Sequence, residues 1–157
     1  MMNSVMKIYE KCEKLPFGKR IFSKLVCLKA PYFGSIKPVF LQLRPGYCEI
    51  LLKKRRAVTN HINSVHAIAM CNVSELAAGT MLEASIPPSM RWIPKGMTVS
   101  YLKIAKTDLK AVCKISLEDL EEPGDFPMTV FVTDTNGVEV FNAVITMHIS
   151  ARKHSQA

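Results

Sequence analysis

Apolar residues follow three different patterns along the chain. Residues 19–29 carry apolar side chains at helical spacing with basic residues between them, which is typical of an amphipathic helix. Residues 67–84 are apolar or small almost without interruption, and Glu75 and Glu83 are the only charged residues there. Residues 138–149 alternate between apolar and polar positions, which indicates a half-buried strand. The chain therefore predicts a mixture of helices and strands.

The first 29 residues predict two helices that are separated near Pro16. The second helix places its apolar residues on one side, namely Ile21, Phe22, Leu25, Val26 and Leu28. Its other side carries Lys19, Arg20, Lys24 and Lys29. Such a helix either packs on the body of the domain or rests on an anionic membrane surface. We treat residues 1–29 as a helical extension and residues 30–157 as the main part of a single domain.

The other segments with strand-like spacing predict a sheet. They are residues 38–44, 47–53, 97–104, 109–117, 128–133 and 138–149. Arg44-Pro45-Gly46 and Asp134-Thr135-Asn136-Gly137 are typical turns between neighbouring strands. A helix over residues 66–85 that is apolar nearly all round must be covered on most of its surface. A curved antiparallel sheet of five or six strands wrapped around it does so, which predicts an α+β protein of the hotdog fold.

The net charge of +8 over 157 residues favours a polyanionic partner, which is a nucleic acid, an acidic membrane or a small molecule rich in phosphate. The sequence has no zinc-finger spacing, aromatic RNA-binding motif or helix-turn-helix, so nucleic acid is not expected. No apolar run reaches the roughly 18–20 residues of a membrane span, and the N-terminus lacks the apolar core of a secretory signal. We therefore expect a cytoplasmic protein.

The cysteines and histidines predict no metal site. Cys12, Cys27, Cys48, Cys71 and Cys113 are scattered without a C-x-x-C pair. Such a set argues against both a disulfide framework and a zinc knuckle. The steps between His61, His66 and Cys71 match no common zinc spacing. We expect reduced thiols in apolar surroundings and no bound metal.

Glu75 is the residue that points most directly to chemistry. It lies in the middle of the predicted buried helix, where an ionised carboxylate is costly to bury unless something compensates it. Asn72 and Gly79 lie about one turn either side of Glu75 and form a small polar stripe with it. That stripe fits either a substrate channel or close packing against another helix.

Four phrases of the sequence carry a resemblance to a known family. They are Ala30-Pro31-Tyr32-Phe33-Gly34-Ser35, Asn60-His61, Val65-His66-Ala67-Ile68-Ala69 and Arg91-Trp92-Ile93-Pro94-Lys95-Gly96-Met97. Across residues 15–150 the chain resembles the hotdog thioesterases of the phenylacetyl-CoA and 4-hydroxybenzoyl-CoA type, and most of all a little-characterised bacterial group among them. The resemblance implies the hotdog fold and the hydrolysis of a thioester.

The resemblance also implies roles for residues at the start of the buried helix. Glu75 stands where the family has a carboxylate that activates water or attacks the thioester carbonyl. The backbone N–H of Ala67 would stabilise the oxyanion, and Asn60 would orient the water or the substrate. His66 is either a catalytic group or a residue that bonds the backbone at the helix entry.

The positions after His66 depart from the family pattern, in which two glycines are usual. Here Ala67 and Ile68 keep the backbone donors but reduce the close approach that glycine permits, and this departure favours binding over turnover. We expect Ile68, Asn72 and Gly79 to contact the substrate.

The distance between Ala67 and Glu75 along the helix limits how the two residues can act together. Ala67 and Glu75 are eight residues apart, which is about 12 Å at 1.5 Å per residue. They cannot both touch one carbonyl group. Two antiparallel helices related by a two-fold axis would bring Glu75 of one chain to the helix start of the other. We therefore expect a dimer, or a tetramer of two such dimers, with a shared site, as the resemblance also implies.

The basic run Lys53-Lys54-Arg55-Arg56 directly precedes the proposed site. Such a run is ordinarily a solvated loop, but here Lys54, Arg55 and Arg56 are candidates for binding the phosphates of coenzyme A. Lys103, near a later strand end, is a further candidate.

These observations together predict an acyl-CoA thioesterase that acts through Glu75. It would need no cofactor, because coenzyme A enters only as part of the substrate. The alternative is a non-catalytic module that binds acyl-CoA or lipid, with Glu75 as a structural carboxylate held across a dimer. In that alternative the basic N-terminal helix rests on a membrane.

Overall fold

The computed structural model describes residues 3–120 and 122–152. Helices α1 (Ser4–Glu13) and α2 (Gly18–Lys29) are followed by the 3-10 helix η1 (Pro31–Ile36). Strands β1 (Val39–Arg44) and β2 (Tyr47–Leu52), the 3-10 turn η2 (Arg56–Val58) and the long helix α3 (Ala67–Ser85) come next. The remaining elements are β3 (Met90–Tyr101), β4 (Leu109–Lys114), the 3-10 helix η3 (Leu117–Leu120), β5 (Gly124–Thr133) and β6 (Glu139–Ala151).

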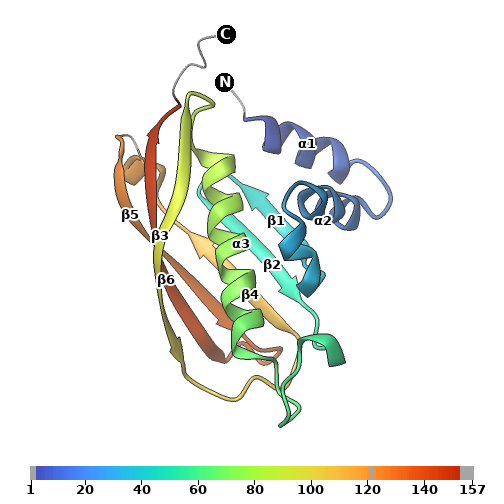
Figure 1. The fold of residues 1–157 in the computed structure, drawn as a ribbon. Coiled ribbons are helices and arrows are strands. Elements are labelled where there is room, and N and C mark those ends of the chain that lie inside the picture. The colour runs from blue at the N-terminus through green and yellow to red at the C-terminus, as the bar shows by residue number, and fades with distance from the viewer. Residues whose placement is uncertain (1–2, 121, 153–157) are drawn as a thin grey trace.

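The strands form one antiparallel sheet in the order β1-β2-β4-β5-β6-β3. The sheet curves around α3, which contacts every strand of the sheet (Figure 1). Val73, Ala77 and Met81 are fully buried because residues four apart share one face of a helix, and this face lies on the sheet. This is the hotdog fold, and the predicted buried helix and antiparallel sheet of five or six strands are confirmed, with six strands in the sheet.

Several strand boundaries differ from the prediction. β3 runs from Met90 to Tyr101 rather than over 97–104, and its register shifts between Pro94 and Gly96. An edge strand tolerates proline because one of its two edges has no ladder of hydrogen bonds to lose. The boundaries 109–117 and 128–133 were also wrong, because β4 ends at Lys114 and β5 begins at Gly124.

Two helices precede the sheet as predicted, and the chain turns sharply between them. Phe17 has a φ of 59°, in the left-handed region. An added Cβ at Gly18 would lie 1.7 Å from a backbone carbonyl oxygen at the end of α1, so position 18 has no room for a side chain. Buried Asn3 attaches α1 to the end of α3 by donating to the carbonyl oxygens of Glu83 and Ile86. Figure 1 shows α1 and α2 packed together beside α3.

One side of α2 covers the free edge of β1. Phe22 is buried and packs edge to face against Tyr9 and Phe40, with ring centroids 5.0 Å apart in both pairs. Ser23 is buried as well, and its Oγ accepts a hydrogen bond from the Phe40 N–H at 3.0 Å. This serine therefore satisfies a backbone donor of β1, the edge strand beyond which the described part of the chain adds no further strand.

The same hydrogen bond explains why the predicted apolar face of α2 was wrong. With Ser23 turned towards the sheet, the helix can bury only part of its wide apolar arc. Val26 is half-buried, whereas Ile21, Leu25 and Leu28 are exposed. None of the helices in the described part of the chain is long and apolar enough to cross a membrane.

Candidate functional site

The loop before α3 is held in shape by Asn60. Its Oδ1 accepts hydrogen bonds from the backbone N–H groups of Ile62 at 3.2 Å and Ser64 at 3.1 Å. Its Nδ2 donates to the Ser64 Oγ at 2.9 Å. The polar atoms of Asn60 therefore form hydrogen bonds within its own loop, and this loop connects directly to the start of α3.

His66 is the N-cap of α3. Its Nδ1 accepts a hydrogen bond from the Ile68 N–H at 3.1 Å, so the hydrogen of the neutral ring is on Nε2. The His66 carbonyl accepts from the N–H groups of Ala69 and Met70. Of the first four N–H groups of α3, only that of Ala67 has no partner among the residues the structure describes. The positive end of the helix therefore offers one free donor.

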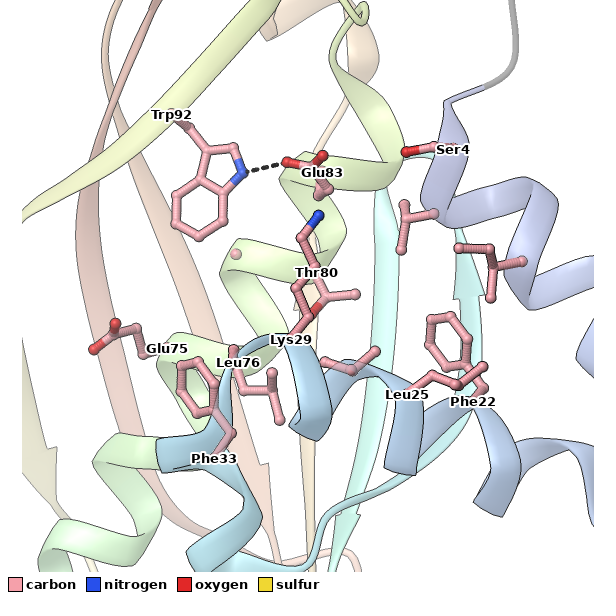
Figure 2. Close-up of a pocket in the computed structure, with 15 residues that line it drawn as sticks. Ser4, Phe22, Leu25, Lys29, Phe33, Glu75, Leu76, Thr80, Glu83 and Trp92 are labelled. Carbon is pink, nitrogen blue, oxygen red and sulfur yellow. Dashed lines mark hydrogen bonds between the residues drawn. The ribbon is translucent and has the colours of Figure 1, made fainter.

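Glu75 lies two turns further along α3 and is half-buried. It lines a cavity of about 320 Å³ that α3 forms with α1, α2 and η1. Figure 2 shows Glu75 at one end of this cavity and Phe22 at the other. Eight residues of helix, about 12 Å, separate Glu75 from Ala67. One chain therefore does not bring the Glu75 carboxylate and the Ala67 N–H to the same atom.

The cavity walls are mainly apolar and come from segments far apart in the sequence. They include Ile8 of α1, Leu25 and Val26 of α2, Phe33 of η1, Leu76 of α3 and Trp92 of β3. Sequence reasoning missed these six as site residues. One feature of the sequence could have indicated the cavity. The segment that forms α2 carries more apolar residues than one buried helix face needs, so some of them were available to line a site.

The ionisable side chains on the cavity wall differ in their surroundings. Glu83 accepts a hydrogen bond from the Trp92 Nε1 at 3.0 Å and lies 3.8 Å from the Arg152 guanidinium. Within residues 3–120 and 122–152, Glu75 and Lys29 form no side-chain hydrogen bond or ion pair. Of the two wall carboxylates, Glu75 is therefore the one available to a ligand.

The residues expected to contact a substrate beside Glu75 lie in different places. Gly79 lines the cavity, and a Cβ there would lie 2.5 Å from the Trp92 ring. Asn72 is buried away from the cavity wall, with its Nδ2 3.5 Å from a serine hydroxyl of η1. Its Oδ1 has no partner among the described residues. Ile68 is exposed at the helix start. Of the three residues of the expected polar stripe, Glu75 and Gly79 therefore line the cavity and Asn72 does not.

The basic candidates lie near the start of α3. A backbone hydrogen bond of 2.8 Å from Val65 to Ala105 joins the segment before α3 to the loop after β3. Lys54 and Arg55 are half-buried, and Arg56 and Lys103 are exposed. The Arg55 guanidinium donates to a carbonyl of η1, which holds it against that helix. None of the four lines the cavity, so a ligand that met them would lie at the helix start.

His61, His66 and Cys71, for which the sequence predicted no metal, form no metal-binding group within the described residues. The Cys71 Sγ lies 3.9 Å from the Tyr101 hydroxyl. Across the described residues, no three His, Cys, Asp or Glu side chains gather in a group that could hold a metal ion.

A curved sheet around one helix, with a carboxylate on that helix beside a cavity, defines a hotdog domain with a candidate ligand site. Residues 18–149 match the family described as a domain of unknown function, DUF4442. The match spans most of the chain, so the chain belongs to this family. The comparison with curated proteins gave no match.

Solved structures agree with this assignment. The crystal structure of a structural-genomics target is 44% identical, covers 94% of this chain and 99% of its own, and superposes with a TM-score of 0.84. A probable thioesterase from Pseudomonas aeruginosa is 20% identical over 88% of this chain and 97% of its own, with a TM-score of 0.76. A hypothetical thioesterase from Streptococcus pneumoniae, solved with coenzyme A, is 16% identical over 74% and 90%, with a TM-score of 0.62. The resemblance to hotdog thioesterases is confirmed at the level of the fold.

Proposed function

We propose that the protein is a thioesterase that hydrolyses an acyl-CoA, or a related thioester, at a site shared by two subunits. The observation that carries the proposal is the position of Glu75, a half-buried carboxylate at one end of an apolar cavity. An apolar cavity suits an acyl group, and a carboxylate beside it suits the activation of water. The shared fold with proteins described as thioesterases supports the same class of reaction.

The reaction needs one base and one oxyanion donor. Glu75 removes a proton from water while the water oxygen adds to the thioester carbonyl carbon. The partner subunit's Ala67 donates its N–H to the oxyanion that forms. The carbon–sulfur bond then breaks, and the thiol leaves with the proton that Glu75 returns. Direct attack by the carboxylate, followed by hydrolysis of the mixed anhydride, uses the same two groups.

The edge strand β3 supports the proposed dimer. It is 12 residues long, has β6 as its one neighbour among the described strands, and leaves side chains such as Ile93 exposed by 60%. A long unpaired edge is a template for pairing with another chain. Two-fold pairing of β3 strands would place two antiparallel α3 helices on one continuous sheet. Each Glu75 would then approach the helix start of the other subunit.

The basic residues at the start of α3 suit the nucleotide end of the substrate. Lys54, Arg55, Arg56 and Lys103 supply cationic donors there, and coenzyme A carries phosphates. The coenzyme A in the Streptococcus pneumoniae protein supports this ligand class. In this arrangement Asn60 and His66 are positioning residues, because their polar atoms hold the loop and the helix start that carry the donor.

A panel of acyl-CoA esters with detection of the free thiol tests the proposal. Glu75→Gln keeps the size of the side chain but cannot accept the proton, so we expect kcat to fall by at least about 100-fold. Glu83→Gln, on the same helix and the same cavity wall, should lower kcat far less, because its carboxylate is engaged by Trp92 and Arg152. Unchanged thiol release by Glu75→Gln would overturn the role of Glu75.

A non-catalytic module that binds acyl-CoA or lipid is the second candidate. The observation that favours it is the helix start, where the Asn60 and His66 side chains accept hydrogen bonds from neighbouring backbone N–H groups and no glycine follows His66. Such a protein would bind acyl-CoA in the same cavity, and the wild-type protein would release no thiol from any ester in the panel.

A further inference from the structure

We propose that the N-terminal helices α1 and α2 set the length of the acyl group that the cavity accepts. The inference rests on the proposed function only in taking the ligand to be an acyl thioester. It concerns two helices to which the family match assigns no site, and one of them, α1, lies before the matched region of residues 18–149.

The arrangement of the walls carries this inference. The near end of the cavity has Glu75, and the far side is formed by Phe22 and Leu25 of α2 and by α1 (Figure 2). Ile8 and Val26 complete the apolar lining on that side. An acyl group whose carbonyl lies near Glu75 therefore points its tail towards the two N-terminal helices.

The size of the cavity sets the expected chain length. At roughly 30 Å³ per non-hydrogen atom, the share of a water molecule in the liquid, 320 Å³ holds roughly ten atoms. A longer chain would have to push α1 or α2 outward or leave the cavity past the exposed side chains of Ile8 and Leu25, and neither buries more of the tail. We therefore expect a medium-chain acyl group rather than an acetyl or a palmitoyl group.

Trp92 makes binding measurable without turnover. It is the only tryptophan of the chain, and it lines the cavity. Its fluorescence is followed while the Glu75→Gln protein is titrated with saturated acyl-CoA esters from acetyl to palmitoyl. Affinity should rise with chain length up to about ten carbons and then stop rising, in keeping with a cavity of about ten atoms.

Two substitutions in the far wall should move this limit in opposite directions. Val26→Phe fills the cavity, so binding of the decanoyl ester should weaken at least tenfold while the acetyl ester is unaffected. Ile8→Ala enlarges the far end and should extend the limit to longer chains. Val144→Phe is the matched control, because Val144 is exposed on β6 away from the cavity.

The outcomes separate this inference from the proposed function. An unchanged chain-length profile in folded Val26→Phe overturns it, and if that variant does not fold, an unchanged profile in Ile8→Ala does so. A shifted profile in a protein that never releases thiol supports the acyl cavity and overturns the thioesterase.

A second inference comes from the outer surface of α2. Ile21, Leu25 and Leu28 follow one another at steps of three or four residues, which places them along one side of α2, while Phe17 directly precedes this helix and Tyr32 follows it in η1. We call these five residues the apolar stripe. All five are exposed, and Phe17 and Leu28 are exposed by 76% and 78%. Leu25 also lines the cavity, so the stripe borders the cavity at this residue. Single exposed apolar residues are ordinary, but an aligned set of this kind marks a contact surface.

The charge of the protein is concentrated in the N-terminal segment that carries the apolar stripe. Residues 1–37 contain eight Lys or Arg and two Glu, which gives +6 of the total net charge of +8. All eight basic side chains are exposed. Lys24 and Lys29 flank the stripe on its two sides at helical spacing.

We infer that the apolar stripe rests on a membrane leaflet that contains anionic lipid. Apolar side chains bordered by Lys and Arg are the pattern of a helix that lies in the plane of such an interface. Each basic residue near an anionic surface adds about 1 kcal/mol of attraction. A second copy of this chain fits the stripe less well, because two N-terminal segments that each carry a net charge of +6 would repel each other.

Vesicle co-sedimentation of the full chain tests this second inference. Neutral phosphatidylcholine vesicles are compared with vesicles that also contain phosphatidylglycerol, at low and at high salt. Binding should require the anionic lipid and weaken with salt. The double variant Phe17→Ser and Leu28→Ser should lose at least tenfold in affinity. Phe131→Ser, on exposed Phe131 of β5, is the control and should bind like the wild type.

Three results would contradict the membrane contact. They are equal binding to neutral and anionic vesicles, no binding to either, and binding that the double variant keeps. Sedimentation equilibrium provides a further check, since self-association that the double variant abolishes would assign the stripe to a second copy of the chain instead.

Discussion

At the scale of single residues, the contact between Gly79 and Trp92 closes one wall of the cavity. A Cβ at Gly79 would lie 2.5 Å from the indole ring, which is itself held by its hydrogen bond to Glu83. Gly79→Ala gains up to about 1 kcal/mol of helix propensity, but overpacking costs about 1–3 kcal/mol. We expect a net loss of about 1 kcal/mol in the free energy of unfolding and a shifted Trp92 emission spectrum.

Urea unfolding followed by fluorescence measures both effects of Gly79→Ala. Gly96→Ala is the control, because a Cβ at Gly96 meets no atom within 4 Å. If the emission spectrum and the unfolding midpoint of Gly79→Ala match those of the control, the Trp92 contact does not constrain α3.

The roles of some site residues could be predicted from the sequence, and those of others could not. Glu75 could be predicted, because an ionised carboxylate in an apolar helix is costly to bury whichever element the helix packs against. His66 could not be decided, because a ring that caps a helix and a ring that transfers a proton need the same position. The structure shows its Nδ1 occupied by the Ile68 N–H, which is a contact that residue spacing alone leaves open.

At the scale of elements, the orientation of α2 depends on Ser23. Its Oγ accepts from the Phe40 N–H at 3.0 Å, and both residues are buried. Ser23→Ala leaves this donor buried without a partner, which costs about 1–3 kcal/mol. We expect an earlier unfolding transition and faster hydrogen exchange at the Phe40 amide. Ser116→Ala, at an exposed position, should change neither measurement.

Strands β2 and β4 carry a pair of buried thiols that reports on the centre of the sheet. Cys48 and Cys113 face each other across the two strands and are fully buried. Burial raises the pKa of the Cys113 thiol to about 12 and that of the Cys48 thiol well above its ordinary value. Because the thiolate is the reactive form, both should resist iodoacetamide at pH 8 in the native protein.

Mass mapping of alkylated peptides checks this expectation. Half-buried Cys71 provides an internal comparison and should be labelled first. Cys48 and Cys113 should be labelled together when urea unfolds the sheet. Early labelling of either one in the native state would show that β2 and β4 separate locally.

The elements themselves were largely predictable, and the failures share a cause. The buried helix and the strand at residues 138–149 repeat their pattern over many residues, so local spacing was sufficient. The start of β3 was missed because Pro94 and Gly96 ordinarily interrupt strands, and only the edge position of β3 tolerates them. The exposed side of α2 was missed because a hydrogen bond to a distant strand sets its rotation.

At the scale of the whole molecule, the two candidate groups of one chain lie too far apart for one reaction. About 12 Å of helix separates the Ala67 N–H from Glu75, and β3 has a free edge along which a second chain can pair. If the site is shared, a mixture of two inactive variants should regain activity. One carries Glu75→Gln, and the other carries Ala67→Pro.

Ala67→Pro removes the free N–H while disturbing the helix little. Ala67 is the first residue of α3, where proline is favoured, and His66 before it has the extended conformation that proline requires. Ala67→Gly keeps the N–H and is the control that should retain activity. Each inactive variant alone should release little thiol from an acyl-CoA ester.

Mixing the two variants in equal amounts under conditions of subunit exchange should restore activity. Half of the dimers then contain one chain of each kind, and each has one site with both an intact Glu75 and an intact donor, so about a quarter of wild-type activity returns. A site within one chain would recover nothing, because neither variant carries both groups. Thiol release that stays at the level of the separate variants, with exchange verified by mass spectrometry, would therefore contradict the shared site.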